Sequence, residues 1–152
     1  ALARAGVRLG GPGVVGWQHG GEAGVHVLRA AFGLGAQLPP RGVDGVALDA
    51  ISGYCSHDYQ LGIFERKLAR GQSVAQILQV NAAPGFSEHH GGDALDIGTP
   101  GDRPAEESFE ATAAFAWLGE YAGRHGFGLS YPRGNPHGIV YEPWHWRFHA
   151  AP

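Results

Sequence analysis

Two short motifs, far apart in the chain, constrain this sequence more than any other feature. The first is Ser87-Glu88-His89-His90-Gly91-Gly92-Asp93-Ala94-Leu95-Asp96, and the second is Glu142-Pro143-Trp144-His145. Together they supply imidazoles, a carboxylate and a further glutamate, which is an adequate inventory for a catalytic zinc site. A hydrolytic zinc ion needs three nitrogen or oxygen ligands and an open position for water, with a base beside that water. The rest of the chain is therefore interpreted as scaffold or substrate pocket around the two motifs.

The spacing of these motifs assigns a role to each of four residues. His89 and Asp96 are seven residues apart, and Gly92 between them permits the tight bend that brings both side chains to one ion. His145 would supply the third ligand from a distant strand. Glu142 lies three residues earlier and is suited to act as general base, because one coordination position must stay open.

Chance and a neighbouring histidine are the competing explanations. The chain has nine histidines, so some pattern of His and Asp arises by chance, and each candidate ligand taken alone is more often a surface or core residue. The joint pattern favours the metal. His90 is the rival of His89, but on a strand-like path its side chain points away from Asp96.

Composition excludes several classes of protein. A chain of 152 residues is long enough for one domain with a real core. The net charge of -3, without a run of Lys or Arg, argues against a nucleic-acid partner. No apolar run approaches the roughly 20 residues that span a bilayer. The single cysteine, Cys55, excludes an internal disulfide framework and a cysteine-rich zinc site.

The start of the chain is unusual, since residue 1 is alanine and no methionine is present. Either a signal peptide has been removed or the chain has been trimmed. We expect a mature, monomeric protein of the cell envelope, in the periplasm, or a secreted protein. A glycine-rich segment over residues 1–40 is expected to be irregular and partly packed, and residues 41–152 are expected to form the domain that carries both motifs.

The first half of this domain is predicted to hold a strand and two helices. Loose apolar alternation over residues 43–51 indicates a strand. Ser56 is predicted to cap a helix over residues 58–69, which Gly71 closes. A short second helix is predicted over residues 73–79.

The second half is predicted to combine one long helix with short strands. The two glycines of the first motif argue against a helix there, and residues 94–97 are predicted to form a strand. The longest helix is predicted over residues 105–124, with an apolar stripe made by Phe109, Ala113, Ala116 and Trp117. Further strands are predicted over 127–131 and 138–141 and near 146–148. Helices interleaved with mostly antiparallel strands, without a βαβ rhythm, predict the α+β class.

The two motifs resemble those of the zinc D-alanyl-D-alanine carboxypeptidases associated with vancomycin resistance. That family is related to the D-Ala-D-Ala dipeptidases and the hedgehog signalling domains. Its pattern is S-x-H-x-x-G-x-A-x-D followed by E-P-W-H, and the chain matches it at Ser87, His89, Gly92, Ala94, Asp96, Glu142, Trp144 and His145. The resemblance implies the hedgehog and D,D-peptidase fold.

The resemblance also implies a reaction and a role for the motif residues. The implied zinc ligands are His89, Asp96 and His145, and the implied catalytic base is Glu142. The implied reaction is hydrolysis, by a metal-activated water, of a peptide bond near the D-alanine terminus of peptidoglycan stem peptides. The residues implied to bind substrate, each with ordinary packing as the alternative, are Tyr54, Gln60, Ser87 and Trp144.

One position departs from the family pattern. The family reads S-G-Y-R-S where this chain has Cys55 in place of the arginine, and that arginine is expected to bind substrate or a developing oxyanion. Losing such a donor costs on the order of 100- to 1000-fold in turnover. Three explanations are open: the substrate differs, catalysis is weak, or the pocket is reached by another arginine, such as Arg66, Arg103 or Arg147. A metal contact by the Cys55 thiolate is a minor alternative.

Two other functions share the same site. A binding module that keeps zinc but has lost catalysis, as hedgehog domains illustrate, is favoured by the missing arginine and disfavoured by Glu142 and Trp144. A cell-wall endopeptidase would use the same zinc chemistry within stems or cross-bridges.

Overall fold

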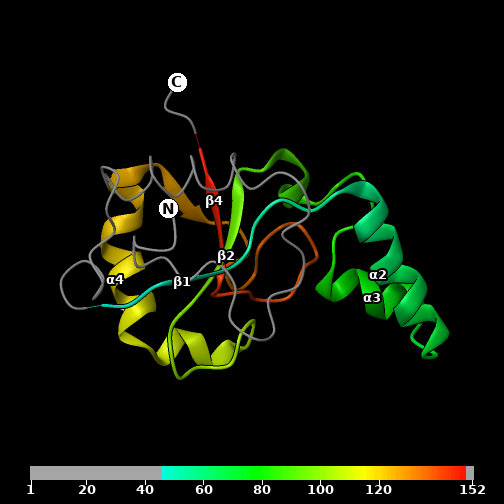
Figure 1. The fold of residues 1–152 in the computed structure, drawn as a ribbon, viewed down its shortest axis with the longest axis horizontal. Coiled ribbons are helices and arrows are strands. Elements are labelled where there is room, and N and C mark those ends of the chain that lie inside the picture. The colour runs from blue at the N-terminus through cyan, green and yellow to red at the C-terminus, as the bar shows by residue number, and fades with distance from the viewer. Residues whose placement is uncertain (1–45, 150–152) are drawn as a thin grey trace, which may run out of the picture.

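A four-stranded antiparallel sheet lies at the centre of the fold (Figure 1). The structure is a computed structural model and describes residues 46–149. The strands follow the order β1-β2-β4-β3, where β1 is Asp49–Ser52, β2 is Ala94–Gly98, β3 is Phe127–Leu129 and β4 is His145–Phe148. All three neighbouring pairs are antiparallel, so the predicted α+β class is confirmed. The glycine-rich segment predicted over residues 1–40 lies outside the described residues.

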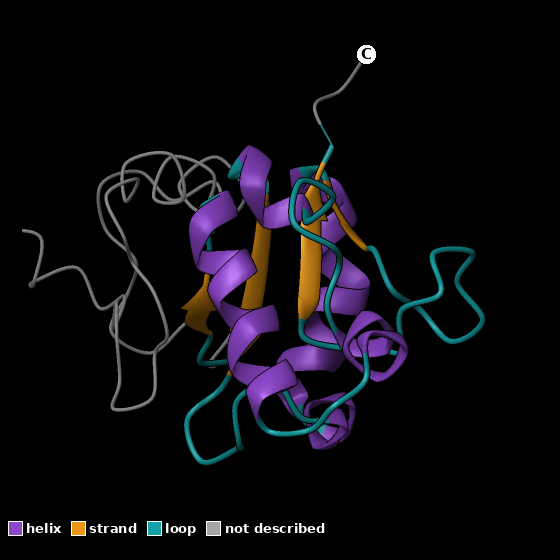
Figure 2. Ribbon diagram, turned by 90° about the vertical axis from the view of Figure 1, so that its right-hand side faces the viewer, coloured by secondary structure: helices purple, strands orange, loops and turns teal. Residues whose placement is uncertain are grey.

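Helices lie to either side of the sheet (Figure 1). α2 (His57–Ala69) and α3 (Val74–Val80) lie on one side, and α4 (Ala113–Tyr121) lies on the other. Figure 2 is seen from the α2 and α3 side and shows the strands behind helices. The described residues also form three short 3₁₀ helices: η2 (Glu88–Gly91), η3 (Glu107–Ala111) and η4 (Ala122–His125). Among residues 46–149, no helix has both the length and the apolar character needed to cross a bilayer.

The main hydrophobic core joins the sheet to α4. Leu95 of β2 and Trp146 of β4 belong to the same buried cluster as Trp117 and Leu118 of α4. Leu95 is 0% exposed and Leu118 is 1% exposed, and full burial of such a side chain contributes roughly 1.5–3 kcal/mol. This packing anchors β2 and β4, the strands that carry residues of both motifs.

The helices α2 and α3 begin at the serines predicted to cap them. The Ser56 hydroxyl accepts a hydrogen bond of 3.1 Å from the Tyr59 backbone N–H. Ser73 and Gln76 form a reciprocal capping box. These contacts satisfy N–H groups that have no partner within the first turn of a helix. Both predicted helices are confirmed.

The prediction of one long helix over residues 105–124 is wrong, because Thr112 interrupts it. The backbone of Thr112 is extended (φ -89°, ψ 155°), and its hydroxyl accepts a hydrogen bond of 3.2 Å from the Phe115 backbone N–H. A threonine that caps a new helix in this way ends the preceding one. The interruption also changes the buried face. Phe109 and Trp117 are buried as predicted, but Ala113 and Ala116 are exposed, and the core receives Ala114 and Leu118 instead.

Residues 138–141 do not form the predicted strand. The Val140 backbone N–H donates to the Gln79 carbonyl at the end of α3, at 2.8 Å, so this segment contacts a helix instead of extending the sheet. Gly138 has a φ of 74°, a left-handed conformation that suits a turn.

The first motif forms a short helical turn followed by β2. The expectation that its glycines exclude a helix is wrong for a 3₁₀ turn, since η2 begins after Ser87 and ends before Gly92. Gly92 has a φ of 74° and closes the turn, a conformation that glycine adopts without steric cost. The strand predicted over residues 94–97 is confirmed as β2. The predicted bend between His89 and the strand therefore exists.

Candidate metal centre

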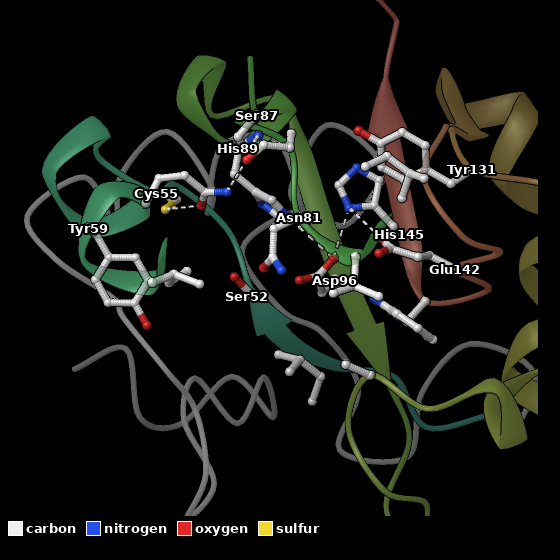
Figure 3. Close-up of a pocket in the computed structure, with 18 of the residues that line it drawn as sticks. Ser52, Cys55, Tyr59, Asn81, Ser87, His89, Asp96, Tyr131, Glu142 and His145 are labelled. Carbon is white, nitrogen blue, oxygen red and sulfur yellow. Dashed lines mark hydrogen bonds and ion pairs between the residues drawn. The ribbon is translucent and has the colours of Figure 1, made fainter. Parts of the chain in front are cut away.

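The fold brings the three predicted ligands together. His89 lies in η2, Asp96 in β2 and His145 in β4. Asp96 and His145 are direct partners in the β2–β4 ladder, so the spacing of neighbouring strands sets their separation. One ligand atom from each of the three residues lies within 4.8 Å of the other two. Figure 3 shows the three side chains converging on one place.

The two distances from Asp96 to the imidazole nitrogens match the spacing of ligands around a tetrahedral zinc ion. Asp96 Oδ1 lies 3.4 Å from His89 Nε2 and 3.0 Å from His145 Nδ1. Two ligand atoms at bond lengths of about 2.0–2.1 Å and tetrahedral angles are roughly 3.3 Å apart. Imidazole nitrogen and carboxylate oxygen are also donors that zinc accepts. The donor types and these two distances therefore fit zinc.

Each imidazole is oriented by a contact on its second nitrogen. His89 Nδ1 donates to the Gly53 carbonyl at 2.6 Å, which leaves Nε2 facing Asp96. His145 Nε2 lies 2.9 Å from a carboxylate oxygen of Glu88, which leaves Nδ1 facing Asp96. Contacts of this kind orient the ring of a metal-binding histidine and define its tautomer.

Glu142 lies beside the three candidate ligands without joining them. Its Oε2 is 4.0 Å from His145 Nδ1, and the residue is 9% exposed. Its backbone N–H donates to the Tyr131 carbonyl at 3.0 Å, which holds the turn before β4. Burial raises the pKa of Glu142 to about 7, opposed by His145 and reinforced by Asp96. A carboxylate with a pKa near neutrality is suited to accept and return a proton.

The remaining charges of the centre favour ionised forms. Burial lowers the pKa of His145, but its hydrogen bonds to Asp96 and Glu88 outweigh this effect and raise the pKa to about 9. Burial also opposes ionisation of Asp96, whereas the charge of His89 and a hydrogen bond from His145 hold its pKa below the usual range. The His145 imidazolium therefore balances the two carboxylates that it contacts.

A pocket of about 690 Å³ opens beside this centre. The three candidate ligands and Glu142 form part of its wall, and Cys55 and Tyr59 lie across from His145 (Figure 3). All four residues predicted to bind substrate line the same pocket: Tyr54, Gln60, Ser87 and Trp144. A concave site of this volume, with several titratable side chains, is typical of a site for a small molecule or a peptide end.

Comparison with known families decides where the chain belongs. The family model for VanY, D-alanyl-D-alanine carboxypeptidase, matches residues 41–151. The chain belongs to the VanY family. A relative, the putative carboxypeptidase YodJ of Bacillus subtilis (strain 168), is 37% identical over 110 residues, which are 69% of this chain and 39% of YodJ. The resemblance inferred from the two motifs is confirmed.

Solved structures agree with membership of the VanY family. The LdcB LD-carboxypeptidase is 30% identical with a TM-score of 0.69, over 84% of this chain and 57% of that one. A variant of the VanY D,D-pentapeptidase from a VanB-type resistance cassette, in complex with Zn(II), is 33% identical with a TM-score of 0.54, over 69% of this chain and 62% of that one. The chain spans less than two thirds of the length of each of these proteins and of YodJ.

At position 55 the chain departs from the VanY pattern, and the structure places a neutral group there. Burial raises the pKa of the Cys55 thiol, and the charge of Asp96 adds to the effect. The sulfur lies 3.6 Å from Gln60 Oε1. A protonated thiol is a poor metal ligand, and the cluster of ligand atoms does not include this sulfur. These observations disfavour a metal contact by Cys55.

Of the three arginines considered as substitutes, Arg66 lines the pocket. It extends from α2, with its guanidinium carbon 5.8 Å from the centre of the Tyr59 ring. Arg147 is instead held by Glu88 at 3.0 Å, and the side chain of Arg103 is 86% exposed. The positive charge nearest the pocket among these three therefore comes from α2.

Two of the predicted substrate-binding residues also have structural partners. Gln60 Nε2 donates to the Ala82 carbonyl at 2.6 Å, and its oxygen faces the thiol of Cys55. The Ser87 hydroxyl accepts a hydrogen bond of 3.3 Å from the His89 backbone N–H. Gln60 therefore shapes the pocket wall with both ends of its amide engaged, and Ser87 stabilises the turn that carries His89.

His90, the rival ligand, is turned away from the centre. Its Nδ1 donates to the Cys55 carbonyl at 2.5 Å, and its Nε2 accepts from the Gly85 backbone N–H at 3.1 Å. Both ring nitrogens are thus engaged by the backbone. This arrangement agrees with the expectation that His90 is not a ligand.

Sequence reasoning did not indicate two residues that contact the centre, Glu88 and Tyr131. The Tyr131 ring lies 4.7 Å from the His145 ring, tilted by 35°. Burial and nearby carboxylates raise the pKa of Tyr131 to about 12, so the phenol is neutral at physiological pH. The signal available for Glu88 was its place next to His89 inside the first motif. Tyr131 ends a segment that sequence reasoning interpreted only as a strand, over residues 127–131, so its contact with His145 was not foreseen.

Proposed function

We propose that this chain is a zinc-dependent carboxypeptidase that hydrolyses peptidoglycan stem peptides ending in D-alanine. The observation that carries the proposal is the convergence of His89, Asp96 and His145 beside a buried Glu142 in one pocket. Membership of the VanY family and the Zn(II) complex of a VanY D,D-pentapeptidase support it.

The three converging side chains would hold the zinc ion, through His89 Nε2, Asp96 Oδ1 and His145 Nδ1. Three protein ligands leave coordination space for water and substrate, as in other hydrolytic zinc sites. When bound, zinc supplies Lewis acidity toward the scissile carbonyl and makes water a stronger acid.

Glu142 is the proposed general base. It accepts a proton from the attacking water and returns it to the leaving amine, so that the C–N bond breaks and D-alanine departs with a neutral or protonated amino group. Its burial keeps the carboxylate out of bulk water, and its distance of 4.0 Å from His145 Nδ1 leaves it next to the ligand set rather than within it.

The pocket beyond the metal centre would receive the end of the peptide. We assign Tyr54 and Trp144 to its walls and Gln60 and Ser87 to its polar lining. Arg66, on the same wall as Tyr59, offers a positive charge complementary to a terminal carboxylate. Because the proposed substrate is a cell-wall polymer, we place the action of the protein outside the cytoplasm. We also propose that the protein acts as a monomer.

A hydrolysis assay tests this proposal. The zinc-loaded chain is incubated with a stem peptide ending in D-Ala-D-Ala, and release of D-alanine is followed by mass spectrometry. Glu142→Ala should abolish turnover while metal analysis still finds bound zinc. Glu110→Ala, which removes an exposed glutamate paired with Arg133, is the control and should leave turnover unchanged. Undiminished hydrolysis by Glu142→Ala would refute the assigned base.

The likeness to the LdcB LD-carboxypeptidase favours a second candidate, in which the residue before the terminal D-alanine has the L configuration. A matched pair of peptides that differ only in that configuration separates the two activities. The same assay tests the remaining alternatives. Zinc retention without any product indicates a binding module, and internal cleavage products indicate an endopeptidase.

A further inference from the structure

We infer that Glu88 is a positioning residue that holds His145 ready for zinc, through a partly buried chain of ionic hydrogen bonds to Arg147 and Asp93. The inference rests on the proposed zinc site and extends it to residues outside the ligand set. Glu88 acts through His145 and has no direct part in the reaction.

The contact between Glu88 and His145 is short and shielded from solvent. Glu88 Oε2 lies 2.9 Å from His145 Nε2, and the two side chains are 14% and 4% exposed. The other ring nitrogen, Nδ1, lies 3.0 Å from Asp96 Oδ1. Since the two nitrogens lie on different edges of the ring, Glu88 and the candidate metal position are on opposite sides of His145.

This placement determines which nitrogen is available to a metal ion. A carboxylate accepts a hydrogen bond but cannot donate one when ionised, so Glu88 keeps the proton on Nε2. When the ring gives up its other proton to bind a metal ion, Nδ1 is then the nitrogen with a lone pair. A negative charge behind the ring also makes the imidazole a more basic ligand.

Glu88 is itself held in place by Arg147, which Asp93 holds in turn. Arg147 Nη1 donates to Glu88 Oε1 at 3.0 Å, and Arg147 Nε donates to Asp93 Oδ2 at 3.0 Å. Arg147 follows His145 by two residues in β4, and residues at this spacing lie on one face of a strand. His145 and Arg147, the residue that holds Glu88 in place, therefore lie on the same strand.

Other roles for Glu88 fit the geometry less well. The pocket wall includes Glu142 but not Glu88, so Glu88 does not face the place where substrate would bind. Its oxygen approaches His145 Nε2, the nitrogen directed away from Asp96, so it does not join the ligand cluster. The role that fits is the contact with His145 Nε2, on the side of the ring opposite the candidate metal position.

Zinc affinity is the property that tests this inference. We would measure the dissociation constant of zinc by competition with a chromophoric chelator at fixed pH. Removing an outer partner of this kind weakens metal binding by about 10- to 100-fold, and we expect a loss in this range for Glu88→Ala. Glu88→Gln keeps an acceptor oxygen but loses the charge, so its affinity should lie between those of Glu88→Ala and the wild type.

Glu110→Ala is the matched control, because it also removes a glutamate from an arginine pair, 2.9 Å from Arg133, but on the surface. Its zinc affinity should equal that of the wild type. Thermal unfolding of each protein in chelator separates positioning from folding. A lower melting temperature with unchanged zinc affinity in Glu88→Ala would mean a purely structural role and would overturn the inference.

The near-isosteric Glu88→Gln variant carries the test if Glu88→Ala does not fold, and wild-type affinity in Glu88→Gln would then overturn the inference. The measurement requires no turnover. Absence of hydrolysis by a tightly zinc-binding wild type would therefore refute the proposed carboxypeptidase function alone.

Discussion

Replacing Glu142 by glutamine should stabilise the metal-free protein, and increasingly so as the pH rises. Burial raises the pKa of Glu142 to about 7 in the folded chain, whereas the unfolded chain has an ordinary glutamate. Between these two pKa values the folded protein holds a proton that the unfolded chain has released. The free energy of unfolding therefore falls as the pH rises through this window. Glu142→Gln has no such group and avoids the loss.

The size of the effect follows from the two pKa values. The difference between 4.5 and about 7 corresponds to about 3 kcal/mol, most of which develops between pH 5 and pH 8. The variant's advantage over the wild type should grow by about this amount across the range. At the urea dependence usual for small proteins this is a shift in midpoint on the order of 1 M.

Urea unfolding in the presence of a chelator, followed by tryptophan fluorescence at several pH values, measures the difference. Groups common to both proteins contribute similarly to both profiles, so the comparison isolates Glu142. Glu120→Gln, at an exposed glutamate, should run parallel to the wild type. Parallel profiles for Glu142→Gln and the wild type between pH 5 and pH 8 would refute the assignment of a raised pKa to Glu142.

Four further outcomes are expected. Asp96→Ala should abolish tight zinc binding, because Asp96 Oδ1 lies close to both imidazole nitrogens; zinc retained after dialysis would contradict this. Zinc binding at pH 7 should release about one proton, because His145 has a pKa of about 9 and binds metal only when neutral. Calorimetry in buffers of different ionisation enthalpy measures this release, which should vanish above pH 10. Leu118→Ala should lower the free energy of unfolding by about 2–5 kcal/mol, because Leu118 is 1% exposed, and a loss below about 1 kcal/mol would contradict the described core. Thr112→Ala should cost about 1 kcal/mol through loss of the α4 cap, whereas Thr112→Ser, which keeps the hydroxyl, should cost little in the same urea titration.

The candidate ligands could be predicted because the residues that would bind metal lie within two short segments at characteristic spacings. A histidine, a glycine that permits a bend and an aspartate on the following strand lie within one short segment, and the second motif adds His145 and Glu142. The structure adds the register that places Asp96 opposite His145. No local pattern encodes the pairing of Asp96 with His145, although the motifs imply that these side chains come together.

The two wrong predictions of secondary structure have a common physical origin. The apolar residues over 105–124 look periodic, but the hydroxyl of Thr112 competes for backbone N–H groups and starts a new helix. Residues 138–141 have the composition of a strand, but Val140 finds its backbone partner on α3. In both cases a specific hydrogen-bond partner replaces the one that the composition of the segment suggests.

The pocket was the least predictable part of the site. Its walls combine residues from α2, the turn after α3 and the segment before β4, and both the neutral Cys55 and the charged Arg66 line it. Contacts between segments so distant in the chain depend on the complete fold. Residue types alone did not distinguish Gln60, whose amide nitrogen and oxygen both have a partner, from a free polar contact.

The pairing of Asp96 with His145 across β2 and β4 has a consequence for folding fidelity. A slip of one residue between these strands would turn one of the two side chains to the opposite face of the sheet and separate the ligands. A bound ion would therefore stabilise only the correct register of β2 and β4. At a free zinc concentration a thousand times the dissociation constant, this stabilisation is about 4 kcal/mol. Metal binding would thus favour the native register over a shifted one, and amide exchange in β2 and β4 should slow when zinc is added.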